Sequence, residues 1–131
     1  LTTLHETGAS IGCHGASHLP LSLVQDADDD IRRARDMLVA RTDPLSGQAM
    51  SFPHGRYNHQ IVSAARSLGY RLLFTSDPVI NPCPNGWLSN DLIGRIPINI
   101  RDIGDKSGNF GPEKMAPWIF LRERRALDGS Y

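Results

Sequence analysis

The chain has 131 residues, of which 40% are hydrophobic and 21% charged, and its 14 basic residues balance 14 acidic ones. This balance excludes an extended basic surface for nucleic acid or an anionic membrane, and no apolar run approaches the length of a bilayer span. Two cysteines exclude a disulfide framework and allow one bridge at most; we expect free thiols. A chain of this length can bury a substantial core, and we expect a single domain over residues 1–131.

Residues 10–13 are predicted to form a short strand entered from a turn at Gly8. Residues 26–41 form the clearest predicted helix, because their apolar side chains recur on one stripe and their aspartates suit a helix N-terminus. The stripe comprises Ala27, Ile31, Ala34 and Leu38. The acidic face is expected to be solvated and to carry two i, i+4 pairs, Asp28–Arg32 and Asp29–Arg33.

The next three predicted elements form a strand, helix, strand unit. Residues 48–52 are expected to be a strand, residues 58–68 a helix capped by Asn58 and ended at Gly69, and residues 71–75 a second strand. This order predicts parallel strands joined by a right-handed crossover.

The second half of the chain is predicted to alternate in the same way. Residues 76–91 are rich in proline, asparagine and glycine and are expected to be irregular, followed by a strand at 95–100 and a loop at 102–112. Residues 113–127 are expected to form a closing helix whose apolar members are Met115, Ile119, Phe120 and Leu121. The pattern predicts an α/β fold in which parallel strands alternate with helices.

His14 and His18 are the strongest candidates for a metal site, since three intervening residues allow two imidazoles to reach one ion. Gly12, Gly15 and Pro20 disfavour a helix here, so we expect a loop at a strand end, where α/β folds place their chemistry. Imidazole ligands favour zinc, yet a catalytic zinc normally has three protein ligands, and the third is not obvious. The alternative is an ordinary loop with two unligated histidines, because this spacing recurs by chance.

Residues 51–58 (SFPHGRYN) predict a rigid aromatic turn of the kind that lines a binding cleft. The residues expected to contact a substrate there are Pro53, His54, Gly55 and Tyr57. Arg95, at the edge of a predicted strand, either orients a carboxylate by bidentate pairing or forms a surface ion pair. Trp87 and Trp118 are candidates to stack on sugar rings, although partial burial is the commoner role of tryptophan. Asp77 follows a strand end and either reaches the site or opens a turn.

These segments resemble, in order, motifs of the polysaccharide deacetylases, the NodB-homology or carbohydrate esterase family 4 group. Residues 8–18 (GASIGCHGASH) look like the metal motif G-x-E-I-G-x-H-[ST]-x-x-H, and residues 51–58 are similar to the groove motif [FY]-x-x-P-Y-G-x-Y-[ND]. Residues 68–75 and 94–98 resemble two later strand segments. The resemblance covers roughly residues 1–125, and its specificity comes from order and spacing.

The resemblance implies part of a distorted (β/α) barrel and a metal-dependent hydrolase. It implies that the enzyme removes acetyl groups from a polysaccharide, with an N-acetylhexosamine polymer as the first expectation, and that the bond cleaved is a carbon–nitrogen bond other than a peptide bond. It further implies that His14 and His18 bind a divalent metal, usually Zn²⁺, and that the backbone N–H of His54 helps hold the oxyanion. The chain itself does not indicate a localisation, and the resemblance implies an extracytoplasmic or cell-envelope location.

Some parts of the family pattern have no match. The third ligand and the catalytic base are adjacent aspartates upstream of the histidine motif, and the general acid is a histidine in a late leucine–histidine motif; neither motif is found in this chain, which opens on Leu1. We therefore expect an N-terminally incomplete domain that pairs with a missing segment of the same protein. Gly15 stands at the Ser/Thr position that braces the loop, and His54 replaces the usual tyrosine. The alternative function is a non-catalytic glycan-binding module that keeps the groove.

Overall fold

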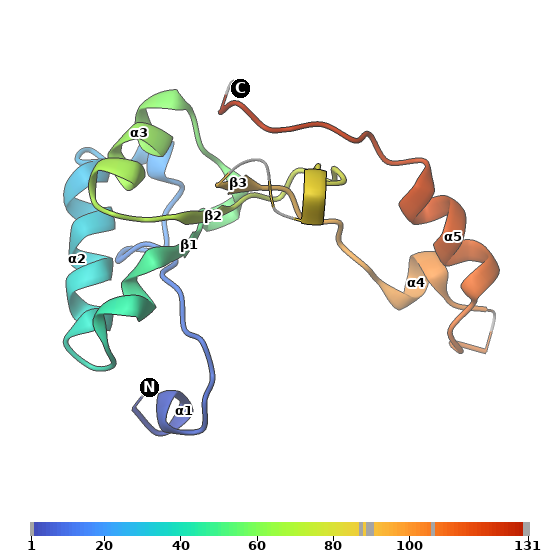
Figure 1. Cartoon of the computed structure of the whole chain (residues 1–131), viewed down its shortest axis with the longest axis horizontal. Coiled ribbons are helices and arrows are strands. Elements are labelled where there is room, and N and C mark those ends of the chain that lie inside the picture. The colour runs from blue at the N-terminus through green and yellow to red at the C-terminus, as the bar shows by residue number, and fades with distance from the viewer. Residues whose placement is uncertain (1, 87, 89–90, 106, 130–131) are drawn as a thin grey trace.

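A small parallel sheet lies at the centre of the fold (Figure 1). The computed structural model describes residues 2–86, 88, 91–105 and 107–129. The strands of the sheet are β1 (Ala49–Ser51), β2 (Leu72–Phe74) and β3 (Leu92–Ile93), in the order β1-β2-β3. Met50 is in register with Leu73, and Leu73 with Leu92; both pairings are parallel. The parallel strands predicted from the sequence are thus confirmed.

The segment at 10–13 lies along the outer side of β1, although it joins the sheet through a single bridge. The Cys13 N–H donates to the Ala49 carbonyl oxygen over 2.8 Å, and the Ser51 N–H donates to the Cys13 carbonyl oxygen over 2.9 Å. The predicted strand at 10–13 is therefore reduced to an isolated bridge at Cys13, because no other residue of the segment is paired with β1. His14 follows directly, at the same end of the sheet as the residues that leave β1 and β2.

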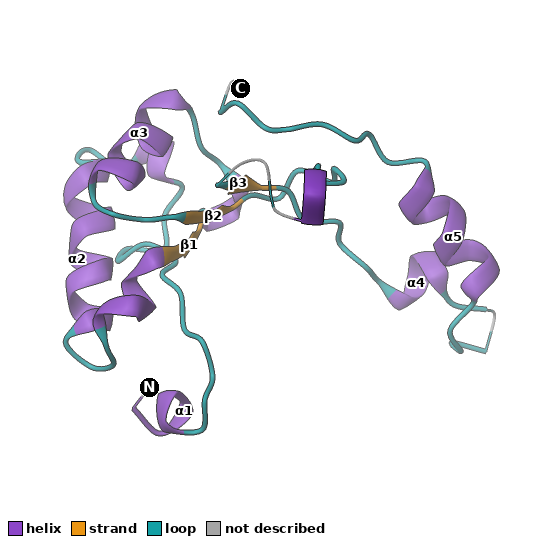
Figure 2. Ribbon diagram, viewed as in Figure 1, coloured by secondary structure: helices purple, strands orange, loops and turns teal. Residues whose placement is uncertain are grey.

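Two helices pack on one face of the sheet, as the sequence pattern predicts (Figure 2). Helix α2 (Ala27–Val39) begins after Asp26, whose side chain accepts the Asp29 N–H, and α3 (His59–Ser67) begins after Asn58, whose side chain accepts the Ile61 N–H. These are N-caps, which satisfy backbone donors that have no partner within the helix. Gly69 ends α3 with φ of 89°, a conformation that glycine adopts without steric cost.

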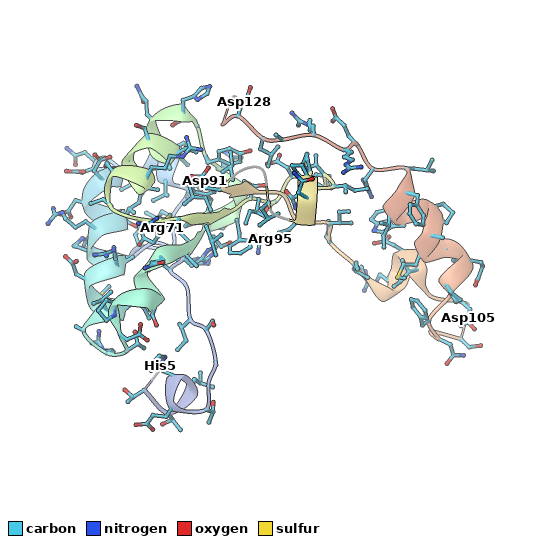
Figure 3. The ribbon with its side chains drawn as sticks, in the orientation of Figure 1. His5, Arg71, Asp91, Arg95, Asp105 and Asp128 are labelled. Atoms are coloured by element: carbon cyan, nitrogen blue, oxygen red, sulfur yellow. The ribbon has the colours of Figure 1, made fainter. Side chains whose placement is uncertain are left out.

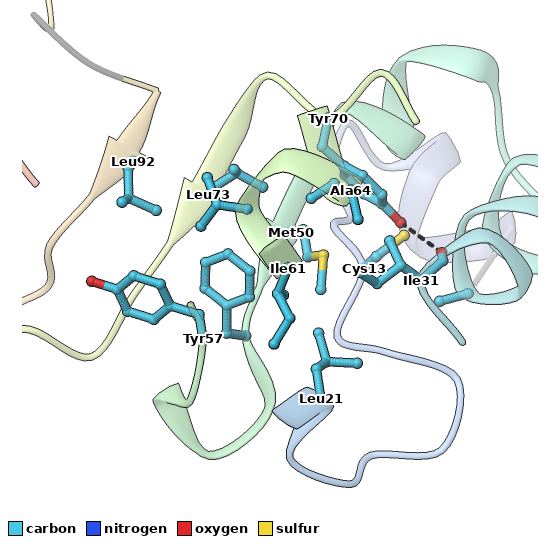
Figure 4. Close-up of a cluster of buried hydrophobic side chains, with 14 of the residues drawn as sticks. Cys13, Leu21, Ile31, Met50, Tyr57, Ile61, Ala64, Tyr70, Leu73 and Leu92 are labelled. Atoms are coloured by element: carbon cyan, nitrogen blue, oxygen red, sulfur yellow. Dashed lines mark hydrogen bonds between the residues drawn. The ribbon is translucent and has the colours of Figure 1, made fainter. Parts of the chain in front are cut away.

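The core lies between this face of the sheet and the two helices (Figure 4). Cys13, Met50 and Leu73 point from neighbouring strands toward Ile31 of α2 and Ile61 of α3, and all five side chains are buried. Their alternation along the strands follows from the two-residue period of β structure. Leu127, near the end of the chain, is buried in the same cluster, so the C-terminal tail returns to the core.

The opposite face of the sheet is open. A hollow of about 880 Å³ is lined there by residues of β1, β2 and the segment at 8–14, and it extends to His5 and Asp43. Leu72 on this face is 40% exposed. The histidine segment therefore borders an accessible concave surface.

The remaining elements are short. They are α1 (Thr2–Glu6), α4 (Ile100–Ile103), α5 (Pro112–Phe120) and the 3-10 turns Leu21–Leu23, Pro44–Gln48, Pro53–Gly55 and Pro84–Gly86. Helices α4 and α5 pack on each other at a distance from the sheet (Figure 1). None of the helices in the described part of the chain combines the length and apolar character that a membrane crossing requires.

The predicted strand at 95–100 is wrong. The strand occupies Leu92–Ile93, because the Arg95 N–H then turns to the Asp77 carbonyl oxygen over 2.9 Å and Pro97 has no N–H to donate to a sheet. Residues 100–103, predicted partly as loop, form α4.

The predicted closing helix at 113–127 is wrong in its extent. Helix α5 spans Pro112–Phe120, and beyond it the Ile80 N–H donates to the Glu123 carbonyl oxygen over 2.8 Å, which holds an extended segment. Its predicted apolar stripe is not a core face, since Phe120 is 80% and Leu121 is 84% exposed.

The charges at the start of α2 also differ from the prediction. Arg32 and Arg33 both pair with Asp29, so the expected Asp28–Arg32 pair is replaced by an i, i+3 contact, whereas Asp29–Arg33 is confirmed at 2.8 Å. The expectation of a solvated acidic face is wrong for Asp30, whose side chain is fully buried. Asp30 precedes Ile31 and lies four residues before Ala34, which puts it on the apolar stripe.

Candidate functional site

His14 is oriented by a hydrogen bond to the end of β1. Its Nδ1 lies 2.7 Å from the carbonyl oxygen of Ser51. Because a carbonyl oxygen only accepts, Nδ1 carries the proton and the Nε2 lone pair is left available. This is the arrangement by which backbone carbonyls orient metal-binding imidazoles.

His18 lies beside His14 on the same loop. The two ring centroids are 5.0 Å apart with an interplanar angle of 58°, and both residues are exposed. His18 has φ of 59°, in the left-handed region that few non-glycine residues adopt. The predicted loop in place of a helix is confirmed, and it brings the two imidazoles to one surface.

A buried carboxylate from α2 braces this loop. Asp30 accepts the Ala16 N–H over 2.8 Å and the Ser17 N–H over 3.0 Å, one with each oxygen. Gly15, with φ of 72°, permits this close approach, because an added Cβ would lie 3.1 Å from both Asp30 Oδ1 and Pro53 Cγ. The Asp30 carboxylate therefore supports the loop by accepting two of its backbone N–H groups. This chain has Gly15 where the motif that it resembles has a hydroxyl side chain.

The turn at 53–55 brings His54 to the histidine loop. His54 has φ of 55° and Gly55 φ of 67°. The His54 ring centroid lies 5.3 Å from that of His18, and its Nε2 lies 3.2 Å from the His18 carbonyl oxygen. The His18 ring thus contacts both the His14 ring and the His54 ring.

Two of the residues expected to contact substrate have buried side chains that pack inside the turn. Pro53 and Tyr57 are buried, and the Tyr57 ring stacks on Phe52 at 4.9 Å between centroids. The Tyr57 hydroxyl donates to Asp77 Oδ2 over 2.6 Å. The ring and hydroxyl of Tyr57 are thus used in packing, and a substrate contact by Pro53 or Tyr57 stays a prediction.

Arg95 reaches the same end of the sheet (Figure 3). Its Nε donates to the Thr75 carbonyl oxygen over 2.7 Å, and its Nη2 to Ser51 Oγ over 3.0 Å. The predicted bidentate pairing with a carboxylate does not occur among the described residues, where these two acceptors take its place. Ser51 consequently touches both His14, through its carbonyl, and Arg95, through its hydroxyl.

The cysteines do not take part in the site. Both are free, with Cys13 buried and Cys83 exposed, as expected. Burial raises the pKa of the Cys13 thiol and so disfavours the thiolate that binds metals. Of the tryptophans, Trp87 lies outside the described residues. Trp118 donates its ring N–H to the Pro97 carbonyl oxygen, and the Arg122 guanidinium lies over its ring.

The described residues supply two imidazoles and no complete ligand set. Within them, no group of three or more His, Cys, Asp or Glu side chains is placed to hold a metal. His14 and His18 therefore fit a divalent cation as part of a site, since both are nitrogen donors of the type that zinc prefers.

Comparisons with known proteins place the chain in a family. Residues 1–73 match the family described as polysaccharide deacetylase. The chain belongs to this family. No curated protein matches it.

Two solved deacetylases share the fold. The Streptococcus pyogenes deacetylase PplD, solved in complex with acetate, aligns with a TM-score of 0.65 and 23% identity over 90% of this chain and 48% of its own. A de-N-acetylase from Aggregatibacter actinomycetemcomitans aligns with a TM-score of 0.50 and 17% identity over 70% of this chain and 30% of its own. The chain thus spans less than half the length of either, and the predicted α/β fold of the NodB-homology type is confirmed.

Sequence reasoning missed the roles of two residues that organise the site, Asp30 and Ser51. For Asp77 it offered either a contact with the site or an ordinary turn, and the structure shows this residue buried as the acceptor of the Tyr57 hydroxyl. The position of Asp30 on the apolar stripe of α2 was a usable signal, because a carboxylate on a buried stripe needs hydrogen-bond donors. Ser51 acts through its backbone carbonyl, which its residue type does not reveal.

Proposed function

We propose that the protein is a metal-dependent deacetylase that hydrolyses acetamido carbon–nitrogen bonds of a polysaccharide, an N-acetylhexosamine polymer first of all. The observation that carries the proposal is the pair His14 and His18. One ring has its Nε2 lone pair left free by the bond to Ser51, and the other lies 5.0 Å away, at the end of a parallel sheet in a chain of this family.

His14 and His18 are proposed to hold the cation, with Zn²⁺ as the first choice for imidazole donors. When bound, a divalent cation supplies Lewis-acid polarisation of the acetyl carbonyl and a lower pKa for a water molecule. The chain's own contribution is to fix the ligands, through the Ser51 carbonyl and the Asp30 carboxylate, because supporting groups of this kind determine ligand orientation.

The exposed turn beside the histidines is proposed to bind the acetyl group. The backbone N–H of His54 is assigned to the developing oxyanion, because preorganised backbone donors stabilise such charge, and the neighbouring Gly55 is proposed to contact the substrate through its backbone. Arg95 has guanidinium N–H groups beyond those bonded to Thr75 and Ser51, and these are proposed to bind substrate or a carboxylate from another segment.

No group of this chain is assigned as base or acid. We propose that a further segment of the same protein supplies them by pairing with the segment at 10–14 on the side that faces away from β1, since Cys13 itself uses its N–H and its carbonyl toward β1. The open face of the sheet supports this proposal: its hollow reaches from Leu72 to His14, and unpaired edges and exposed apolar faces favour such pairing.

The test is acetate release from N-acetylglucosamine oligomers by the full-length protein, which includes the segment proposed to carry the base and acid, measured with and without a chelator and after addition of Zn²⁺. His14→Ala and His18→Ala are expected to reduce release to background, whereas His59→Ala, at the exposed start of α3, serves as the matched control and is expected to retain activity. Full activity of both ligand variants would refute the proposal.

The incomplete ligand set among the described residues favours one alternative, a glycan-binding module without catalysis. In that case oligosaccharides bind with an affinity that the chelator does not change, and no acetate appears on prolonged incubation.

A further inference from the structure

The side chain of His54 has contacts that its proposed backbone role does not require. Its ring faces His18 at 5.3 Å between centroids, and its Nε2 lies 3.2 Å from the His18 carbonyl oxygen, across 36 residues of sequence. A residue chosen only for its main-chain N–H would not need a nitrogen-bearing ring at this point.

The direction of this hydrogen bond follows from the acceptor. A carbonyl oxygen has no proton to give, so the Nε2 of His54 is the donor and its Nδ1 is not needed for the bond. The bond therefore selects one tautomer of His54, in the same way that the Ser51 carbonyl selects one tautomer of His14. Tautomer selection is an observable that separates this bond from simple ring packing.

The bond acts on the strained part of the histidine loop. His18 has φ of 59°, a conformation that is sterically unfavourable for a non-glycine residue. The backbone before it is fixed by Asp30, which accepts the Ala16 and Ser17 N–H groups. The His18 carbonyl is on the other side of the strained residue, and His54 is the side chain that holds it.

We propose that the His54 imidazole is a positioning residue for His18: its Nε2–H holds the His18 carbonyl and its ring packs beside the His18 ring, so that the imidazole of His18 is presented next to that of His14. This inference rests on the proposed function in so far as His18 is a metal ligand. It adds a role for the side chain to the one proposed for the backbone of the same residue.

Three variants separate the donor, the ring and the backbone conformation. His54→Gln keeps an N–H donor at about the position of Nε2, and His54→Phe keeps a ring without a donor. His54→Asn tolerates a positive φ as well as histidine does, but its side chain is too short to reach the carbonyl. His59→Phe, a histidine replaced by phenylalanine on exposed α3, is the control for general effects of the change.

The first readout is the affinity for Zn²⁺ alone, measured by calorimetric titration. Loss of a group that orients a ligand typically weakens metal affinity by about 10–100-fold. We expect His54→Phe and His54→Asn to bind Zn²⁺ about tenfold more weakly than the unaltered protein, and His54→Gln and His59→Phe to remain within about twofold of it. Equal affinity of the phenylalanine and unaltered proteins, or a glutamine variant as weak as the phenylalanine one, would overturn the proposal.

The second readout needs no metal and no variant. Long-range ¹H–¹⁵N correlation spectra of the unaltered protein, recorded with the imidazoles in the neutral form, are expected to show His54 protonated on Nε2. Protonation on Nδ1 would overturn the inference, because Nε2 then has nothing to donate. Failure of the unaltered protein to bind Zn²⁺ would refute the proposed metal site, while the tautomer of His54 would still decide the hydrogen bond.

Discussion

The carboxylate of Asp30 is expected to be the largest single contributor to the stability of the histidine loop. In Asp30→Asn one oxygen remains to accept the Ala16 N–H. The side-chain NH₂ group replaces the oxygen that accepted the Ser17 N–H, so that two hydrogen-bond donors face each other. In Asp30→Ala both acceptors are lost. The two variants therefore remove one and two hydrogen bonds from a position that is fully buried.

The magnitude follows from the kind of bond. A hydrogen bond to a charged group contributes about 1.5–3 kcal/mol, so two such bonds sum to about 3–6 kcal/mol. Removing the buried carboxylate also removes its desolvation cost, which offsets part of this sum. We expect the free energy of unfolding to fall by about 2–4 kcal/mol in Asp30→Ala and by about 2 kcal/mol in Asp30→Asn, where the unmatched donor cancels the remaining bond in part.

The assay is urea denaturation with a shift of the midpoint at constant m-value. The matched control is Asp28→Asn, an exposed aspartate two residues earlier in the same helix, for which we expect a change within about 0.5 kcal/mol. Equal stability of Asp30→Asn and Asp28→Asn would refute the reasoning, because it would show that the buried carboxylate contributes nothing beyond the surface charge of the helix start.

Three further changes test the surroundings of the site. Gly55→Ala places a Cβ 2.5 Å from Ser76 Oγ at φ of 67°, and we expect a loss of at least about 1–2 kcal/mol in urea unfolding; an unchanged midpoint would contradict the close approach. Tyr57→Phe removes the 2.6 Å hydrogen bond to a buried carboxylate and is expected to cost about 1–3 kcal/mol; a neutral effect would argue that this acceptor is satisfied without the phenol. Arg66 donates two hydrogen bonds to Asp91 and holds the pKa of that carboxyl below its usual value, so the pair stabilises the fold above the ordinary pKa and this stabilisation disappears as pH falls through the lowered one. The free energy of unfolding of Asp91→Asn should accordingly be about 0.5–1 kcal/mol lower near pH 7 and equal to that of the unaltered protein in strong acid. A difference in stability that persists in acid would contradict this assignment.

Local signals predicted much of the fold because they depend on neighbours in sequence. Asn58 and Gly69 bound α3 through cap chemistry that operates within four residues, and the periodic apolar residues of α2 face the core as the 3.6-residue repeat requires. The strand expected at 95–100 failed because Arg95 bonds instead to Asp77, a partner that only the folded chain brings near.

The candidate site likewise has some features that the sequence predicts and others that it does not. The spacing of His14 and His18, with glycines around them, was sufficient to predict a loop with two adjacent imidazoles. The contacts of His54 and Asp30 join segments more than ten residues apart, so residue type and spacing alone do not reveal them. The contact of His54 with the His18 carbonyl and that of His14 with the Ser51 carbonyl determine which ring nitrogens carry protons, whereas Asp30 fixes the backbone of the loop.

The attachment of Asp30 to the loop also has a dynamic consequence. Helix α2 contributes Ile31, Ala34 and Leu38 to the core. Asp30, directly before Ile31, accepts the Ala16 and Ser17 N–H groups. Segments tied to a core helix open with it in one cooperative unit. The Ala16 and Ser17 amide protons should therefore exchange with deuterium about as slowly as those of α2, although they lie in a surface loop.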